Sequence, residues 1–280
     1  MKPPPFRYLR PTTLDEALDA LARLGEEAKP LAGGQSLVPM LNFRLARPGV
    51  LVDLAWIPGL DELRVSHDEV RLGAMTRQRV VERDARIAAR LPVLRDAVGH
   101  IGHVQIRARG TVGGSLAHAD AAAELPALAL ALDASVDATS VDGTREIAAA
   151  DLFQGPWTTC LAPHELLTGV RIPLGWERGA VRELARRHGD FALAGVVGAR
   201  RPATPDDPGV RLVGFGVGWT PVRLVGAEAA LVTGAPATEV AAVAAEEVDP
   251  MDDIHADASW RRDGLRSLVG QVVRDLGVVA

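Results

Sequence analysis

Two Gly-Gly pairs, each with a hydroxyl residue shortly after it, are the segments of this sequence best suited to bind a phosphate. The first pair lies in Ala32-Gly33-Gly34-Gln35-Ser36-Leu37 and the second in Thr111-Val112-Gly113-Gly114-Ser115. Glycine permits positive φ and lets a ligand approach the backbone amides, and successive amides in such a turn form a concave anion site. The hydroxyl groups add further hydrogen-bond donors. Both segments are therefore predicted to be loops that bind a diphosphate.

The glycine pairs alone indicate nothing, because the chain is rich in glycine. With 28 glycines among 280 residues, about three adjacent pairs are expected by chance, and two are present. The significance lies in their shared context, a short apolar segment before and a hydroxyl residue after. Neither G-x-G-x-x-G nor G-x-x-x-x-G-K-[ST] occurs. A dinucleotide would therefore occupy a site unlike the Rossmann site.

The other reactive side chains form no clear catalytic or metal-binding pattern. His100 and His103 are three residues apart, but no third ligand stands near them, so we predict no metal site. Cys160 is the only cysteine, which excludes an intrachain disulfide and a cysteine-ligated iron–sulfur cluster built by this chain alone. We also predict no catalytic acid or base.

The composition is typical of a globular protein of two domains, at roughly 100–200 residues each. The net charge is -5 and no basic stripe is present, so a nucleic-acid partner is not expected. No apolar run reaches the ~20 residues of a membrane span, and the N-terminus lacks the apolar run of a signal peptide. With a single cysteine, these features favour a cytoplasmic protein.

The elements that must position the two motifs follow an α+β order, because helices, short strands and hairpins succeed each other without regular βαβ alternation. Thr13-Leu14-Asp15-Glu16 has the form of a capping box and predicts the start of an amphipathic helix. Around the motifs we predict strands at 50–54, 70–72 and 166–172, helices at 37–45, 80–99 and 124–132, and a hairpin turning at Asp142-Gly143. Beyond a break near Pro173 we predict strands at 181–185, 193–199 and 210–217, and helices at 222–231 and 259–276.

The order of these motifs resembles that of the FAD-binding medium subunit of molybdenum hydroxylases, the family of xanthine dehydrogenase and carbon-monoxide dehydrogenase. The glycine motifs are followed by His118-Ala119-Asp120, Glu124-Leu125-Pro126, Arg186-Arg187-His188-Gly189-Asp190-Phe191-Ala192 and Thr220-Pro221-Val222-Arg223. The resemblance covers essentially the whole chain. Two positions depart from the family pattern, because Ser115 replaces a frequent Asn and Phe191 stands where some relatives have Tyr.

The resemblance implies a fold similar to p-cresol methylhydroxylase and vanillyl-alcohol oxidase. It implies an FAD-binding domain at 1–175, in lobes of about 1–55 and 56–175, and a smaller α+β domain of the carbon-monoxide dehydrogenase flavoprotein type at 176–280. One glycine loop from each lobe would close on the pyrophosphate of a noncovalently bound FAD. Beyond the two motifs, the cofactor-binding residues that the resemblance implies are Ile101, Asp120, Glu124, Leu167, Asp190 and Phe191. Glu124 is also explained as a first-turn helix acid, and Asp190 as a turn residue.

The activity implied by the resemblance is electron transfer. In the family, a large subunit hydroxylates substrate at a molybdenum cofactor, a small subunit carries [2Fe-2S] clusters, and the flavin subunit of the heterotrimer passes electrons to an external acceptor. Two alternatives stay open: a free-standing FAD-dependent oxidase or dehydrogenase, and a noncatalytic scaffold with a degenerate flavin site. Substrate-driven reduction of flavin in the isolated chain would favour the first, and failure to bind FAD would favour the second.

Overall fold

The structure is a computed structural model, and it describes residues 2–277 of the chain. The first part of the chain forms a three-stranded parallel sheet. The sheet order is β1 (Arg7–Leu9), β3 (Val50–Asp53) and β2 (Ala28–Leu31). The predicted capping box begins α1 (Leu14–Leu24): the Thr13 hydroxyl accepts from the Glu16 amide at 3.2 Å, and the Glu16 carboxylate accepts from the Thr12 amide at 2.7 Å. The first glycine motif follows β2 and leads into α2 (Leu37–Asn42). The parallel sheet therefore presents this motif at the carboxyl ends of its strands.

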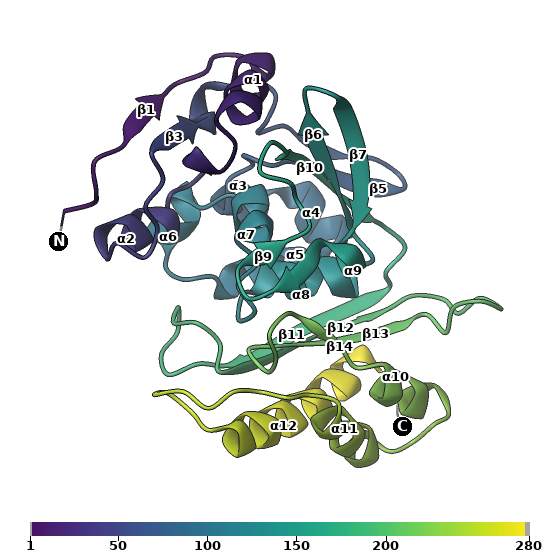
Figure 1. Cartoon of the computed structure of the whole chain (residues 1–280). Helices are drawn as coiled ribbons and strands as arrows, with labels where there is room; N and C mark the ends of the chain where they lie inside the picture. The colour runs from purple at the N-terminus through teal and green to yellow at the C-terminus, as the bar shows by residue number, and fades with distance from the viewer. Residues whose placement is uncertain (1, 278–280) are drawn as a thin grey trace.

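A five-stranded antiparallel sheet with helices packed on it forms the next part of the chain (Figure 1). Its strand order is β4 (Leu63–Val65), β5 (Glu69–Gly73), β10 (Leu166–Pro173), β6 (Ser135–Ser140) and β7 (Gly143–Ala148). The helices are α3 (Gln78–Arg83), α4 (Ala85–Arg90), α5 (Pro92–His100), α6 (Val104–Arg109), α7 (Val112–His118), α8 (Glu124–Ala131) and α9 (Ala149–Leu152). A small hairpin, β8 (Phe153–Gly155) with β9 (Thr158–Thr159), follows α9. The hairpin predicted at Asp142-Gly143 joins β6 to β7 as expected.

The predicted helix at 80–99 is wrong as a single element, because it is broken into α3, α4 and α5. Asp84 is extended, and its carboxylate accepts from the amides of Arg86 and Ile87, which starts a new helix. Pro92 starts the third helix, since proline has no amide to continue the second. The residues do form helices with an apolar face, but local capping ends one helix and starts the next.

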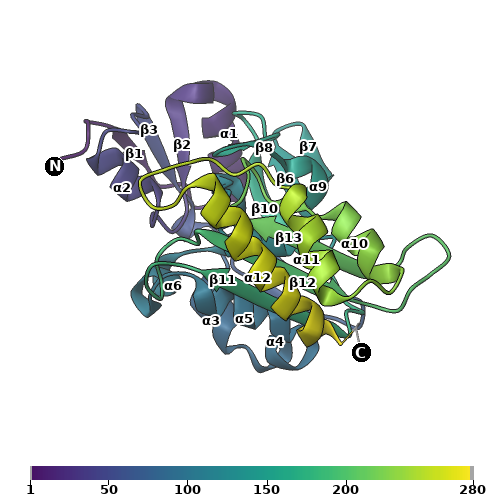
Figure 2. The same ribbon diagram turned by 90° about the horizontal axis from the view of Figure 1, so that it is seen from below.

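The last part of the chain is a four-stranded antiparallel sheet with three helices on one face (Figure 2). The strands are β11 (Arg178–Leu184), β12 (Ala194–Arg200), β13 (Val210–Phe215) and β14 (Val222–Arg223), and the helices are α10 (Val225–Val232), α11 (Ala237–Glu246) and α12 (Ala258–Leu276). The predicted helix at 222–231 starts too early, because its first residues pair with β13 as β14. Helices α6, α7, α9 and α11 were not predicted.

The antiparallel sheet of β11 to β14 is buried on both faces, which joins it firmly to the rest of the chain. Val197 and Phe215 pack into the same core as α5 and α8, whereas Val196 and Leu212 pack against α10, α11 and α12. Arg211 of β13 donates to Asp133, just after α8, at 3.1 and 3.0 Å. The expected α+β class is confirmed. None of the helices within residues 2–277 combines the length and apolar character that a membrane crossing requires.

Candidate functional site

The two glycine motifs lie against each other although 77 residues separate Gly33 from Gly110. A β-carbon on Gly33 would lie 2.4 Å from the Arg109 carbonyl oxygen and 2.8 Å from Gly110 Cα. A β-carbon on Gly114 would lie 3.2 Å from Ala32 Cβ. Since real β-carbons essentially never approach another atom as closely as 2.4 Å, a side chain at Gly33 would push the two segments apart, whereas one at Gly114 would require Ala32 to shift slightly. The structure therefore brings the predicted diphosphate motifs into one place.

The first motif is the loop that the sequence predicts. Gly34 has φ of 71°, a conformation that favours glycine, and the Gln35 side-chain amide donates to the Gly33 carbonyl at 3.1 Å. Within the described residues, the backbone amides of Gly34, Gln35 and Ser36 make no hydrogen bond to the protein. Three consecutive free amides at a positive-φ turn are donors suited to an anion.

The second motif is not a loop, and this prediction is wrong. It forms the first turn of α7, with Thr111 as the N-cap, and the Thr111 hydroxyl accepts from the Gly114 amide at 3.0 Å. The amides of Val112 and Gly113 donate to the carbonyls of Thr76 and Ala74 at 3.0 and 2.9 Å. Tertiary bonds thus stabilise a helix that its glycines disfavour. The motif contributes a helix N-terminus packed against the first loop, with Ser115 half-buried beside it.

A cation that the sequence did not single out stands next to both motifs. Arg77, half-buried, donates to the Arg109 carbonyl and forms an isolated β-bridge with Thr111. Burial, and then repulsion by Arg109, lower the pKa of Arg77. Its positive charge complements a diphosphate. No sequence signal marks Arg77, because its place depends on a contact 32 residues away along the chain.

The implied flavin-side residues divide into two groups, of which the first lies around the end of α5. Ile101 ends α5, and Asp190 and Phe191 are exposed in the loop between β11 and β12. A β-carbon on Gly189 in that loop would lie 2.7 Å from the His103 ring. The loop of Asp190 and Phe191 therefore touches the segment that follows Ile101.

The second group is less accessible to a ligand. Asp120 is half-buried, and its carboxylate accepts from the Ala122 amide at 2.9 Å. Glu124 is the first residue of α8 and only 7% exposed; burial, with a smaller contribution from the charge of Glu183, raises the pKa of Glu124 to about 8. Leu167 lies in β10 within the hydrophobic core, 4% exposed. Glu124 thus lies in the first turn of α8, and its raised pKa means that it stays protonated at a higher pH than an exposed glutamic acid does.

Comparison with known proteins decides the family. Residues 4–175 match the family described as the FAD binding domain in molybdopterin dehydrogenase. The chain belongs to this FAD-binding family. It is 42% identical over 279 residues to the 6-hydroxypseudooxynicotine dehydrogenase complex subunit alpha of Paenarthrobacter nicotinovorans, which covers 96% of this chain and 93% of that relative. It is 39% identical to the nicotine 6-hydroxylase medium subunit of the same organism, over 99% of both chains.

Solved structures agree with this membership in the FAD-binding family. A chain of carbon monoxide dehydrogenase from Hydrogenophaga pseudoflava superposes with a TM-score of 0.93 at 33% identity, covering 100% of both chains. A chain of quinoline 2-oxidoreductase from Pseudomonas putida 86 superposes with a TM-score of 0.91 at 32% identity, again over 100% of both. The expected family and the expected cofactor class, FAD, are confirmed.

The described residues fit the FAD that this family binds. The loop from Gly33 to Ser36 has three backbone amides without a protein partner, and Arg77 supplies positive charge beside it. Within residues 2–277, no group of three His, Cys, Asp or Glu side chains is placed to hold a metal ion. The arrangement can therefore bind and orient a dinucleotide.

Proposed function

We propose that this chain is the FAD-binding medium subunit of a molybdenum hydroxylase complex. It holds FAD noncovalently and passes electrons from [2Fe-2S] clusters of a partner subunit to an external acceptor. The observation that supports this most strongly is the contact of Gly33 with Arg109 and Gly110, because it brings the two distant glycine motifs together. The relatives are named as subunits of dehydrogenase and hydroxylase enzymes, which agrees with this role.

We further propose that residues 1–175 form the FAD-binding domain, in lobes of about 1–55 and 56–175, and that 176–280 form the C-terminal domain. The first lobe supplies the amides of the loop, and the second supplies Arg77 and the N-terminus of α7. We assign the diphosphate to the residues of the two motifs, Ala32, Gly33, Gly34, Gln35, Ser36, Leu37, Thr111, Gly113, Gly114 and Ser115. We assign the flavin side to Ile101, Asp120, Glu124, Leu167, Asp190 and Phe191.

The proposed partners are a large subunit with the molybdenum cofactor and a small subunit with [2Fe-2S] clusters, in a cytoplasmic complex. One cysteine cannot ligate an iron–sulfur cluster, so the clusters must lie on another chain. FAD supplies the ability to exchange electrons singly or in pairs. The role of this protein is to position the ring and to tune its potential through nearby hydrogen bonds and charges.

FAD titration of the purified full chain tests this function. We expect saturable binding of about one FAD per chain, measured by absorbance and by quenching of flavin fluorescence. We also expect that N-heterocyclic substrates leave the bound flavin oxidised until the partner subunits are added. Flavin reduction by substrate in the isolated chain would indicate a free-standing dehydrogenase instead, and absence of FAD from both the chain and its complex would indicate a scaffold.

A further inference from the structure

Gln78, the first residue of α3, lies directly behind the place where the two glycine motifs meet. It is only 4% exposed, and its backbone amide donates to the Gly110 carbonyl at 2.9 Å. A β-carbon on Gly110 would lie 2.4 Å from Gln78 Oε1, whereas Gly110 Cα lies 2.8 Å from the position of a β-carbon on Gly33. Gly110 therefore contacts Gly33 with its Cα and faces Gln78 with the position that a side chain would occupy.

Space, rather than backbone conformation, requires glycine at position 110. Gly110 has φ of -55° and ψ of 144°, which any residue can adopt. The atoms nearest to its hypothetical β-carbon are Oε1 and Cδ of Gln78, at 2.4 and 2.9 Å, and the next is the Ile106 carbonyl oxygen at 3.1 Å. Gln78 therefore fills most of the space that a side chain at position 110 would need.

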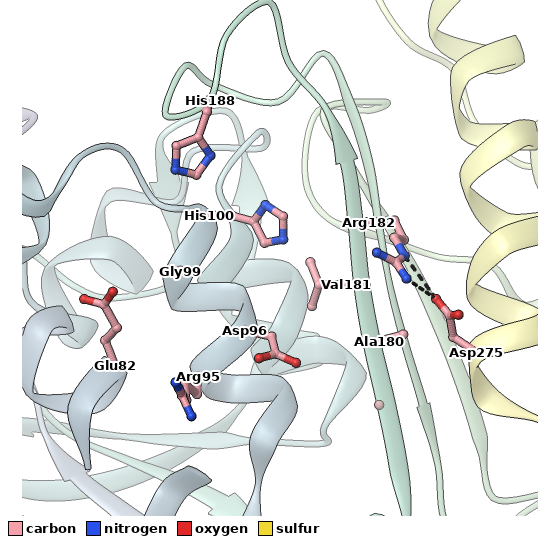
Figure 3. Close-up of a pocket in the computed structure, with 11 residues that line it drawn as sticks. Glu82, Arg95, Asp96, Gly99, His100, Ala180, Val181, Arg182, His188 and Asp275 are labelled. Atoms are coloured by element: carbon pink, nitrogen blue, oxygen red, sulfur yellow. Dashed lines mark hydrogen bonds and ion pairs between the residues drawn. The ribbon is translucent and has the colours of Figure 1, made fainter. Parts of the chain in front are cut away.

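Helix α3, which carries Gln78, is bonded to the second glycine motif and to α6. Arg77, just before Gln78, forms an isolated β-bridge with Thr111. Glu82, one turn further along α3, accepts from Arg107 of α6 at 2.9 and 3.1 Å. Figure 3 shows the Glu82 side chain projecting from α3 at the wall of an open cavity that α5 also lines. These bonds hold Gln78 in a fixed place beside the second motif.

The contact between Gln78 and Gly110 is steric on the side-chain side. Gln78 Oε1 is buried and has no hydrogen-bond partner in the described part of the chain. A buried polar atom without a partner calls for an explanation. Since this oxygen accepts no bond, the side chain contributes volume at this place, and that volume lies against Gly110.

We propose that Gln78 is a positioning residue for the diphosphate, because it keeps Arg109 and Gly110 packed against Gly33 and so sets the distance between the two glycine motifs. The inference rests on the function proposed above, which places the diphosphate of FAD between these motifs. A smaller residue at position 78 leaves a void behind Gly110, and neighbouring atoms shift to fill such voids in part. The two motifs then separate, and the amides of the first loop and the N-terminus of α7 no longer meet the same diphosphate.

A double-mutant cycle between Gln78 and Gly110 tests the inference by fluorescence titration of the full chain with FAD. We expect Gln78→Ala to weaken FAD binding by about tenfold, since it opens a void, and Gly110→Ala to do the same, since its β-carbon has no room. In the double variant the new methyl group occupies the space that the Gln78 amide leaves. Its FAD affinity should therefore return to within about threefold of wild type. ADP, which shares the diphosphate with FAD, should show the same pattern by calorimetry.

Two further variants separate the position of the diphosphate from general stability. Gln78→Met keeps the length of the side chain and loses no hydrogen bond of Oε1, so it should bind FAD within about threefold of wild type. Gly198→Ala places a β-carbon against Val272, between β12 and α12. It should lower the free energy of unfolding in urea and leave FAD affinity unchanged.

Three results would overturn the positioning role while FAD binding by the wild-type chain stands. They are wild-type FAD affinity in Gln78→Ala, simple addition of the two single losses in the double variant, and an equal loss in Gln78→Met and Gln78→Ala. If the wild-type chain binds no FAD, the proposed function itself fails.

Discussion

Gly33 approaches Arg109 so closely that a β-carbon on Gly33 would lie 2.4 Å from the Arg109 carbonyl oxygen. The contact joins the loop after β2 to the segment that leads into α7. The same carbonyl oxygen accepts a hydrogen bond from Arg77. One backbone atom therefore contacts both the first glycine loop and the Arg77 guanidinium, just before α7 begins. This geometry accounts for the proposed diphosphate site in a chain that has no Rossmann fingerprint.

A first prediction separates backbone strain from ligand contact in the first glycine loop. Gly34 and Gly59 both have positive φ, 71° and 84°, so alanine at either position should cost about 1–2 kcal/mol of stability. Only Gly34→Ala should weaken FAD affinity, by at least about tenfold, because Gly34 carries a free amide in the proposed site. Fluorescence titration with FAD and urea unfolding measure the two effects. Equal FAD affinity in both variants would show that the loop of Gly33 to Ser36 is not part of the FAD site.

A second prediction concerns the pH dependence of stability. The folded pKa of Glu124, about 8, is raised above its unfolded value, so the chain loses stability as pH rises through the window from about 4.5 to 8. Glu124→Gln should remove this loss and raise the unfolding free energy of the FAD-free chain at pH 8 by up to about 5 kcal/mol. Urea unfolding at pH 5 and pH 8 measures the difference.

Glu165 provides the matched contrast for that experiment. Its pKa is lowered by hydrogen bonds from Arg145, so Glu165→Gln should destabilise the chain at pH 8. If Glu124→Gln also destabilised the chain at pH 8, ionised Glu124 would have to be well stabilised in the fold, contrary to this account.

A third prediction concerns Arg107, which is buried and joins α3 to the segment that follows α5. Its guanidinium donates to Glu82 and to the carbonyls of Ile101 and Gly102. Arg107→Met should cost about 3–5 kcal/mol, because it leaves these acceptors without their donor. It should also weaken FAD binding by freeing the Ile101 segment. Arg266→Met, which breaks a surface pair with Asp263, should change the unfolding free energy by less than about 1 kcal/mol.

A fourth prediction concerns the start of α7. Thr111→Val removes the hydroxyl that accepts from the Gly114 amide and should cost about 1 kcal/mol. Thr111→Ser keeps the cap and should retain most of the stability. If Val and Ser gave the same unfolding free energy, the cap would contribute nothing, and the tertiary bonds of Val112 and Gly113 alone would hold the helix.

Local signals in the sequence predicted the local parts of this structure. The capping box at Thr13 and Glu16 and the turn at Asp142-Gly143 depend on neighbours a few residues away, and both are present. The first glycine motif was also predicted as a loop. Family resemblance, rather than any pattern of residues, led to FAD.

Long-range contacts explain what the sequence did not predict. Gly113 and Gly114 disfavour a helix, but bonds from Val112 and Gly113 to the segment after β5 fold them into α7. Arg77 reaches the site through the Arg109 carbonyl and a β-bridge with Thr111, and His100 meets Glu183 across 83 residues of chain. No spacing or periodicity in the sequence encodes these contacts, because each joins segments that lie far apart in the sequence.

A crystal structure of the full chain with FAD bound tests the central claim most directly. We expect the diphosphate between the loop of Gly33 to Ser36 and the N-terminus of α7, with its oxygens within hydrogen-bond distance, about 3 Å, of at least two of the free amides of Gly34, Gln35 and Ser36. A diphosphate bound elsewhere, with that loop facing solvent, would contradict the account.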